Sequence, residues 1–329
     1  MLTVRKTPGR DFRILNLTDI HLRRGEMAEN HPYRRVFEYT LSELLDRVSP
    51  DLITVTGDIS WAGDDAAHAL TADILDATGI PWAPIWGNHD VQLGYAYIDA
   101  FADDFLARKN CLFEKGDPAL GSGNYVVAIE ENGVPRTALF MMDTHAGSTY
   151  IGTDGKEHGT QGRLNDAQIA WFRANAADLK SRGCTDAALF VHIPPHVYGE
   201  AERAAFPAYI DWPNLQYERI SDLPFHNPGW ESVTGVELES VACPCIDDGV
   251  YTALADSVIA KAIVAGHDHI NNWIIPYHGI TLCYGLKITP SSYWRPYLNG
   301  GTVLCVTDAG LTDIHHEYVN AEHLWHTWH

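Results

Sequence analysis

Five short clusters of aspartate, histidine and asparagine are spread along the chain, and each follows a run of apolar residues. Carboxylate, imidazole and amide side chains are ligands that divalent transition metals accept in proteins. Together the clusters offer enough ligands for two cations, and a two-metal site is a known means of hydrolysing phosphate esters. The clusters are Asp19-Ile20-His21, Gly57-Asp58, Gly87-Asn88-His89-Asp90, Val191-His192 and Gly266-His267-Asp268-His269.

The spacing within the clusters suits shared metal binding. Asp19 and His21 are two residues apart, as are His267 and His269, so in an extended chain each pair would point the same way. The carboxylate of Asp58 has two oxygens and could bridge two ions. Each fragment alone is more typical of a polar turn or a hydrogen-bonded histidine than of a ligand. Their joint occurrence at strand ends is what favours a metal centre.

The elements that position these clusters are predicted from hydrophobic spacing. In the first half, short apolar runs indicate buried strands, and apolar residues three and four apart indicate helices. This alternating order predicts a mainly parallel sheet, whose functional groups lie at the carboxyl ends of the strands. The strands are expected at Phe12 to Leu17, Asp51 to Thr56 and Trp82 to Trp86, and the helices at Tyr33 to Val48, Ala66 to Thr78 and Tyr97 to Lys109.

The second half begins with a predicted hairpin and continues with mixed elements. Asn132-Gly133 is a strong hairpin turn signal, and Asn165 with Gln168 resembles a helix capping box. Residues 194–247 show weak periodicity and many aromatic residues, and we expect a long ordered loop over the active site. No linker is evident, which predicts one domain over residues 1–329. Strands are expected at 124–130, 137–143, 187–192, 262–265, 273–276, 280–284, 302–306 and 312–317, and helices at 166–181 and 250–257.

The bulk composition limits the partners. The chain has 329 residues and a net charge of −20, so its surface repels nucleic acid and anionic membranes. Two bound cations would still attract a small phosphate ester to the site itself. No apolar run approaches the roughly 18 residues needed to span a bilayer. The sequence therefore favours a small-molecule substrate and predicts neither nucleic-acid nor membrane binding, while the oligomeric state stays open.

The six cysteines and the N-terminus predict a cytoplasmic location. The cysteines show no zinc-ribbon spacing, and Cys243-Pro244-Cys245 is too close for a CxxC redox motif. They are expected to be reduced and packed. The first residues run into a polar stretch and then the first strand, without the apolar segment of a signal peptide.

The ordered set of clusters resembles the calcineurin-like metallophosphoesterase superfamily, over residues 12–308 and closest to a small subgroup related to purple acid phosphatases. The resemblance implies a four-layer αββα sandwich with two mixed β-sheets. The matching segments are Leu17-Thr18-Asp19-Ile20-His21, Val55-Thr56-Gly57-Asp58, Trp86-Gly87-Asn88-His89-Asp90, Phe190-Val191-His192 and Ala265-Gly266-His267-Asp268-His269.

The same resemblance implies roles for individual residues. A water activated by two cations, which could be Mn²⁺, Fe²⁺ or Zn²⁺, would attack phosphorus. His89 would stabilise the transition state or protonate the leaving oxygen, with Asp90 orienting it. One ion would be held by Asp19, His21, Asp58 and His269, and the other by Asp58, Asn88, His192 and His267, with Asp58 bridging.

One position differs from the corresponding residue of purple acid phosphatases. In purple acid phosphatases a tyrosine three residues after the bridging aspartate binds ferric iron, whereas Trp61 stands there in this chain. An indole cannot serve as that ligand, which predicts the absence of a tyrosinate charge-transfer band.

The substrate is left open by the sequence. His145 and His196 are candidate substrate contacts, and either could equally be an ordinary polar loop residue. Aromatic residues of the 194–247 segment (Tyr209, Trp212, Tyr217, Phe225 and Trp230) could stack on a substrate or only pack the loop. The expected activity is that of a phosphodiesterase or phosphomonoesterase acting on small molecules. Alternatives are a cyclic nucleotide phosphodiesterase and, in another class, a non-catalytic metal-binding regulatory protein.

Overall fold

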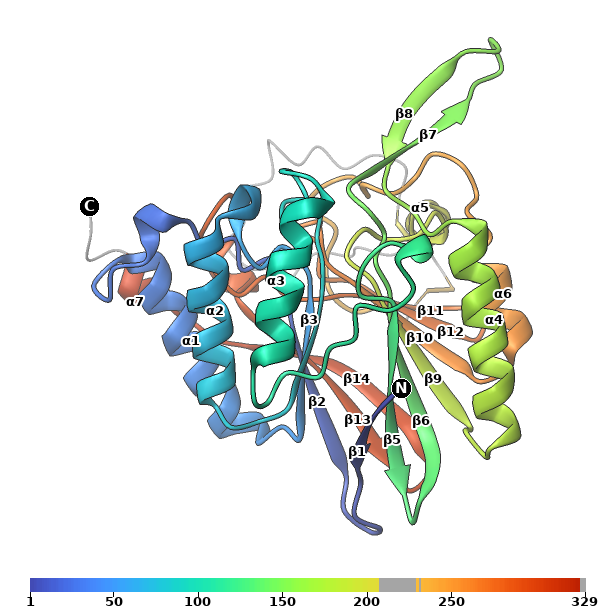
Figure 1. Ribbon diagram of the computed structural model, residues 1–329, viewed down its shortest axis with the longest axis horizontal. Helices are drawn as coiled ribbons and strands as arrows, with labels where there is room; N and C mark the ends of the chain where they lie inside the picture. Colours follow the sequence, from blue (N-terminus) through green and yellow to red (C-terminus); the bar gives the residue numbers. More distant parts are fainter. Residues whose placement is uncertain (207–228, 231, 326–329) are drawn as a thin grey trace.

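Two mixed β-sheets lie face to face in the computed structural model, with helices on both outer sides (Figure 1). The structure describes residues 1–206, 229–230 and 232–325. The smaller sheet has the strand order β14 (Gly310–Tyr318), β13 (Gly300–Thr307), β2 (Phe12–Leu17), β3 (Leu52–Thr56) and β4 (Trp82–Ile85). The larger sheet has the order β1 (Leu2–Arg5), β5 (Tyr125–Glu131), β6 (Val134–Met141), β9 (Asp186–Phe190), β10 (Ala260–Ala265), β12 (Ile280–Tyr284) and β11 (Ile274–Tyr277).

Both sheets have a parallel centre and antiparallel additions. Strands β2, β3 and β4 are parallel to one another, and so are β6, β9, β10 and β12. Antiparallel pairing joins β13 to β2 and to β14, β5 to β6, and β11 to β12. The parallel strands carry the predicted clusters just after their carboxyl ends. The expected pair of mixed sheets is therefore confirmed.

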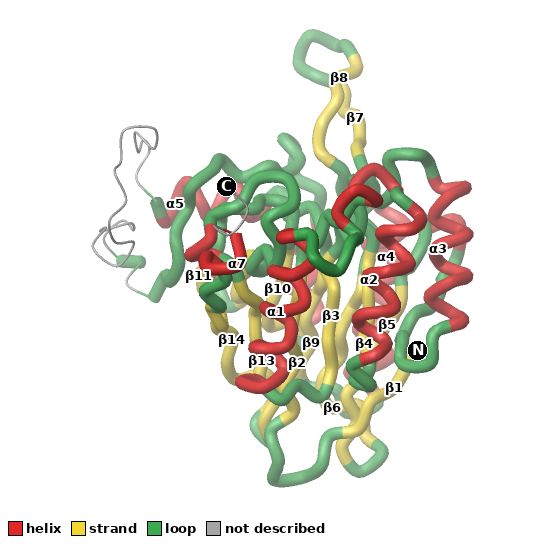
Figure 2. Tube along the Cα trace, turned by 90° about the vertical axis from the view of Figure 1, so that its left-hand side faces the viewer, coloured by secondary structure: helices red, strands yellow, loops and turns green. Residues whose placement is uncertain are grey.

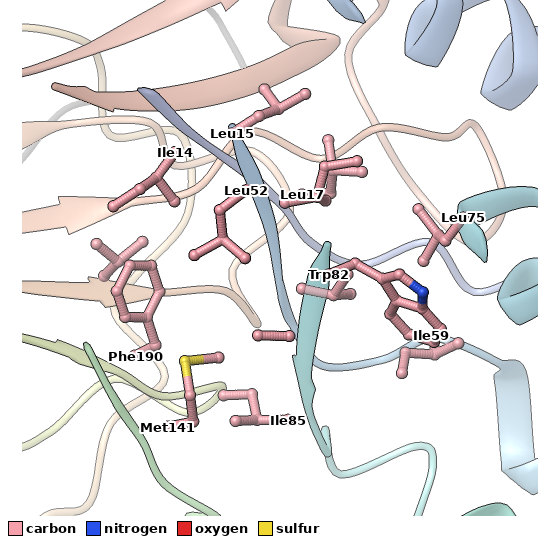
Figure 3. Packing of buried hydrophobic residues seen from close by; sticks show 14 of the residues in the cluster. Ile14, Leu15, Leu17, Leu52, Ile59, Leu75, Trp82, Ile85, Met141 and Phe190 are labelled. Atoms are coloured by element: carbon pink, nitrogen blue, oxygen red, sulfur yellow. The ribbon is translucent and has the colours of Figure 1, made fainter. Parts of the chain in front are cut away.

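The larger sheet is buried on both faces, which explains its nearly continuous apolar strands. Alternate residues point to opposite faces of a strand. In β9, Ala188 and Phe190 pack toward the smaller sheet, whereas Ala187 and Leu189 belong to a second core under the outer helices. Figure 3 shows Phe190 and Met141 of the larger sheet in the cluster that also contains Ile85 of the smaller one. One core thus joins the two sheets and fixes their relative position.

The helices form the two outer layers. On the side of the smaller sheet lie α1 (Pro32–Val48), α2 (Asp65–Ala77) and α3 (Tyr95–Ala107), and on the side of the larger sheet lie α4 (Asp166–Ser181), α5 (Val197–Ala205) and α6 (Val250–Ser257) (Figure 1). The capping box of Asn165 and Gln168 is present at the start of α4, as predicted. A short helix, α7 (Glu322–Trp325), contacts α1 near the C-terminus. The protein is the four-layer sandwich that the sequence indicated.

Several segments differ from the expectation. The strand β1 (Leu2–Arg5) belongs to the larger sheet, although its residues were expected to precede the first strand. Residues 197–205 form the helix α5 and not a loop, because Val197, Tyr198, Ala201 and Ala205 present one buried side to the larger sheet. The two prolines just before this short helix interrupt the sequence, so the helical spacing of its apolar residues was not recognised. The aromatic residues Tyr209, Trp212, Tyr217 and Phe225 lie outside the described residues, whereas Trp230 packs against Tyr277.

A two-stranded hairpin, β7 (Gly147–Ile151) and β8 (Glu157–Gln161), was not predicted. It projects away from both sheets in two perpendicular views (Figures 1 and 2). Its residues are mostly exposed and polar, so the sequence lacks the alternation that marks a half-buried strand. Among the described residues, the helices are too short or too polar to cross a membrane.

Candidate metal centre

The five clusters come together at one end of the two sheets. Asp19, Asp58 and Asn88 follow β2, β3 and β4 of the smaller sheet, and His192 and His267 follow β9 and β10 of the larger sheet. Backbone hydrogen bonds tie the loops to each other: Asp19 N–H donates to Gly57 O over 3.2 Å, and Gly266 N–H donates to His192 O over 3.0 Å. The packing of the sheets therefore brings residues far apart in sequence into one place.

One group of buried side chains has the geometry of a cation site. His21 Nε2 lies 2.8 Å from His269 Nε2, 3.5 Å from Asp19 Oδ1 and 3.3 Å from Asp58 Oδ2. The ligand atoms of the four residues lie within 4.8 Å of one another. The group contains Asp19, His21, Asp58 and His269.

The hydrogen bond of His269 and two carboxylate oxygens direct acceptors toward the centre of this group. His269 Nδ1 faces the carbonyl of Tyr293 at 3.1 Å, so it donates and leaves a lone pair on Nε2. Asp19 Oδ1 and Asp58 Oδ2 are buried and have no hydrogen-bond partner in the described part of the chain. Buried carboxylate oxygens without donors are costly unless a cation compensates them. The residues present therefore fit a divalent ion.

A second set of expected ligands adjoins the first through Asp58. The same oxygen, Asp58 Oδ2, lies 3.2 Å from His192 Nε2, which is 2.9 Å from Asn88 Oδ1. His192 Nδ1 faces the carbonyl of Thr56 at 2.8 Å and donates to it, so a bound cation that displaces the proton from Nε2 would find the lone pair directed toward the centre. The ring of His267 packs edge-on against His192 with centroids 5.2 Å apart. All seven expected ligands are thus gathered in one region.

The backbone of the centre is not extended, contrary to the reasoning from spacing. Asp19 and His21 both have φ 54°, Asp58 has φ 51° and His267 has φ 78°, which are left-handed conformations. Such a conformation costs roughly 1–2 kcal/mol for a residue with a side chain. Asp19 and His21 still approach each other, but through this turn. His267 and His269 do not act as one pair, because His267 lies beside His192 and His269 beside His21.

Close backbone approach explains two glycines of the clusters. A Cβ at Gly87 would overlap the carboxylate of Asp58, and one at Gly266 would overlap the hydroxyl of Thr18. Any larger residue at either position would push a strand-end loop away from the centre.

The electrostatics of the centre keep most imidazoles in the neutral, ligand-ready form. Burial lowers the pKa of His267 to about 3, and burial followed by the charge of Lys287 lowers the pKa of His21 and of His269. Burial raises the pKa of Asp19, but contacts with His21 and His269 outweigh it and hold the pKa well below its usual range. His192 differs: burial lowers its pKa, yet the carboxylate of Asp58 raises it to about 9. Negative charge around His192 therefore favours a cation there.

Two supporting residues were missed by the sequence analysis. The ammonium group of Lys287, which is buried, donates to the backbone carbonyl of Asp19 over 2.6 Å. Thr18 donates its hydroxyl to Asp19 Oδ2 over 2.7 Å, and His267 N–H donates to the same oxygen over 3.1 Å. A lysine inside the otherwise apolar run around Leu286 and Ile288 was the available signal for Lys287.

His89 lies beside the centre. Its ring stacks on Trp61 with centroids 4.1 Å apart and an interplanar angle of 20°, and its centroid is 5.0 Å from that of His21. Its backbone N–H donates to Asp58 Oδ1 over 2.8 Å. Trp61, which stands where purple acid phosphatases have a tyrosine, therefore packs against His89.

Asp90 makes different contacts from those expected. Its buried carboxylate accepts hydrogen bonds from the backbone N–H groups of Ile59, Ser60 and Gly87 at 2.9–3.2 Å. These bonds tie the loop after β3 to the loop after β4. The carboxylate thus supports the backbone around Asp58, and the expected orientation of His89 by Asp90 has no contact in its favour among the described residues.

The two candidate substrate contacts are in different surroundings. His145 lies 3.1 Å from Gln168 Oε1 through Nε2 and lines a cavity of about 460 Å³ with Lys115 and Ser122. His196 Nδ1 lies 2.8 Å from the carbonyl of Pro244, a contact that holds the segment before α6 against α5. His145 thus borders open space, whereas His196 has a contact within the fold.

Family membership follows from this architecture and from direct comparison. A model of the calcineurin-like phosphoesterase family matches residues 12–271, which include every expected metal ligand. The chain belongs to the calcineurin-like phosphoesterase family. This family consists of hydrolytic phosphoesterases that depend on two metal ions, so a binuclear centre is the family's arrangement.

Relatives within the calcineurin-like phosphoesterases carry different names. The chain is 27% identical to a protein named probable inactive purple acid phosphatase 28 from Arabidopsis thaliana, over 87% of this chain and 72% of the relative. It is 26% identical to phosphatase DCR2 from Saccharomyces cerevisiae, over 99% of this chain but 54% of the relative. It is 33% identical to a probable cyclic nucleotide phosphodiesterase from Psychrobacter arcticus, over 57% of this chain and 62% of the relative.

Solved structures share the calcineurin-like phosphoesterase fold. A dimetal phosphatase from Danio rerio matches with a TM-score of 0.54 at 12% identity, covering 94% of this chain and 99% of that one. A purple acid phosphatase from yellow lupin seeds matches with a TM-score of 0.53 at 11% identity, covering 96% of this chain and 52% of that one. These matches agree with the four-layer arrangement of the sheets and helices.

Proposed function

We propose that this protein hydrolyses phosphate mono- or diesters of small molecules with two divalent metal ions. The observation that carries the proposal is the position of Asp58 Oδ2, 3.3 Å from His21 Nε2 and 3.2 Å from His192 Nε2, with no hydrogen-bond donor in the part of the chain that the structure describes. A carboxylate oxygen between two sets of acceptors suits a bridging ligand. Nitrogen and oxygen ligands of this kind fit Mn²⁺, Fe²⁺ or Zn²⁺.

The side chains divide into two ligand sets in this proposal. When bound, the two cations would polarise the phosphoryl oxygens and lower the pKa of water. Lys287 holds the carbonyl of Asp19 and so keeps one end of the centre in place. Asp90 fixes the loops that carry Asp58 and Asn88. One set is Asp19, His21, Asp58 and His269, and the other is Asp58, Asn88, His192 and His267.

His89 is the proposed general acid, or a donor to the phosphoryl oxygens in the transition state. It is not needed as a ligand, and its stack on Trp61 directs the ring beside His21. A positioned acid of this type contributes about 10²–10⁴-fold to a rate. In this proposal Asp90 serves as a positioning residue and not as a catalytic one.

The acidic surface supports a small substrate and not a polynucleotide. A net charge of −20 repels nucleic acid, whereas a small ester carries too few charges to be excluded from a site that holds two cations. A cyclic nucleotide is the second candidate substrate. It is favoured by the relative from Psychrobacter arcticus, whose name gives that activity.

A non-catalytic metal-binding protein is the alternative from another class. The word inactive in the names of relatives from Arabidopsis thaliana motivates it. The presence of His89 beside a full set of candidate ligands supports catalysis instead.

The test is metal reconstitution followed by turnover. Protein reconstituted with Mn²⁺ should bind about two ions per chain, measured by elemental analysis, and should hydrolyse p-nitrophenyl phosphate, bis-p-nitrophenyl phosphate or cyclic AMP. Two bound ions without hydrolysis of any ester would favour the regulatory alternative. Failure to bind two ions would remove the basis of the proposal.

A further inference from the structure

Three side chains form a stack at one side of the metal centre. The guanidinium carbon of Arg23 lies 4.3 Å from the centre of the Trp61 ring, and the imidazole of His89 lies 4.1 Å from it. Two groups cannot both lie about 4 Å above one ring on the same face without overlapping. Arg23 and His89 therefore occupy opposite faces of Trp61, with one indole between them.

The stack is built by two loops that are fastened together. Trp61 N–H donates to Leu22 O over 3.1 Å, which joins the loop after β3 to the loop after β2. The backbone N–H of Arg23 donates to Glu26 Oε2 over 3.1 Å at the start of a single helical turn. These bonds fix the backbone around Arg23, and the contact with Trp61 holds its guanidinium, before any ligand arrives, which lowers the entropy that binding costs.

Arg23 has donors that the described residues do not satisfy. Its Nε is buried and has no hydrogen-bond partner among the described residues, and a carboxylate oxygen of Glu26 lies 3.8 Å from it. The adjacent arginine differs, because Arg24 makes ion pairs with Asp64 and Asp65. In an acidic protein, an arginine held in place but weakly paired is suited to an incoming anion.

A cavity of about 540 Å³ opens beside the stack. Leu93 and Tyr97 in its wall are each 52% exposed, so apolar surface accompanies the charge. Trp61 lies between the guanidinium of Arg23 and the imidazole of His89. A ligand whose reacting phosphoryl group lies at His89 could therefore contact Arg23 only through a second group elsewhere on the same ligand. The cavity is lined by Arg23, Arg24, Trp61, Asp64, Leu93 and Tyr97, among others.

We propose that Arg23 binds a second phosphoryl group of the substrate, so that the preferred esters carry a diphosphate or a second phosphate beyond the reacting one. The inference rests on the proposed function and specifies its substrate class. A guanidinium matches phosphate with two parallel hydrogen bonds, which a lysine cannot provide. Trp61 supports Arg23 on one face and His89 on the other, and so links the second subsite to the reacting centre.

The test compares two ligands that differ by one phosphoryl group. AMP and ADP are measured as competitive inhibitors of p-nitrophenyl phosphate hydrolysis at one fixed concentration of free Mn²⁺. In the wild-type protein the inhibition constant of ADP should be at least about tenfold lower than that of AMP, which corresponds to about 1.4 kcal/mol. Arg23→Gln should reduce this ratio to near one, and Arg23→Lys should restore only part of it.

Arg173→Gln is the matched control, since this arginine of α4 pairs with Asp256 of α6 and is not part of the cavity, so the ratio should stay at its wild-type value. A wild-type ratio near one, or a ratio unchanged in Arg23→Gln, would overturn the inference. If the Mn²⁺-loaded protein hydrolyses neither p-nitrophenyl phosphate, bis-p-nitrophenyl phosphate nor cyclic AMP, the proposed function fails, and the same ratio is then measured from dissociation constants by calorimetry. The inference and the proposed function can thus fail separately.

Discussion

Asp58 Oδ2 lies 3.2 Å from His192 Nε2, and this contact crosses from one β-sheet to the other. Asp58 follows β3 of the smaller sheet, whereas His192 follows β9 of the larger one. A cation shared by these side chains would connect the two halves of the sandwich. Metal binding is therefore expected to stabilise the fold as well as to supply the chemistry.

Asp58→Asn should lower the metal content of the protein toward zero, because one residue serves both proposed ligand sets. An asparagine keeps one oxygen but loses the charge. Elemental analysis after reconstitution with Mn²⁺ measures this. A ligand at 100 times its dissociation constant stabilises a protein by about 2.7 kcal/mol, so Mn²⁺ should raise the melting temperature of the wild type but not of this variant.

Asp64→Asn is the control for Asp58→Asn. Asp64 caps α2 by accepting from Ala66 N–H and Ala67 N–H, and asparagine is an equally good cap. Its metal content should equal that of the wild type. Retention of both ions by Asp58→Asn would contradict a bridging role.

His89→Ala should reduce turnover by about 10²–10⁴-fold while leaving the metal content at the wild-type value. The side chain stacks on Trp61 beside the centre and is not among the proposed ligands. Initial rates with p-nitrophenyl phosphate and elemental analysis are measured on the same sample. Normal turnover by the variant would exclude the proposed role of His89.

Iron-reconstituted wild-type protein should show no tyrosinate absorption band in the visible range, because Trp61 occupies the position of the phenolic ligand. Trp61→Tyr places a phenol there and should gain such a band at equal iron content. A coloured wild-type protein would mean that another tyrosine binds the metal.

His68 should make the fold sensitive to acid. It is buried in α2, stacked on Phe101 at 4.1 Å, and burial lowers its pKa from 6.5 to about 3. Below pH 6.5 the His68 side chain is therefore protonated in the unfolded chain, whereas in the folded protein it stays neutral down to about pH 3. The free energy of unfolding should fall over that range, by several kcal/mol at its lower end.

His68→Met should flatten this pH dependence when unfolding by urea is compared at pH 7.5 and pH 5. Methionine fills an aromatic pocket without a titrating group. Identical profiles for His68→Met and the wild type would refute the prediction.

Glu237 should lower the free energy of unfolding as the pH rises, whereas His68 lowers it as the pH falls. Burial, followed by the adjacent carboxyl of Glu202, raises its pKa from 4.5 to about 8, so the folded protein retains a proton that the unfolded chain releases. The resulting stability is complete below pH 4.5 and is lost as the pH rises to about 8. Glu237→Gln should match the wild type near pH 4.5 and be more stable above pH 8. Equal stability of the two proteins at pH 8.5 would disprove this assignment.

Much of the fold could be predicted because local patterns and global packing agree. The helix at Asp166–Ser181 and the strand at Ile280–Tyr284 have the predicted bounds. In both elements the apolar residues recur at a regular spacing, and residues typical of helix or strand ends mark the boundaries. The hairpin β7–β8 and the helix α5 were missed, because one is polar and exposed and the other is short.

The sequence by itself determined which side chains could hold metals, because ligand types and their position after apolar strands are local properties. Only the tertiary structure decided how they meet. His267 and His269, two residues apart, lie beside different histidines, since a left-handed turn at His267 separates them. Lys287 contacts Asp19 and Arg23 contacts Trp61, although neither pair is close in sequence. Those contacts depend on the packing of two sheets, which no local pattern encodes.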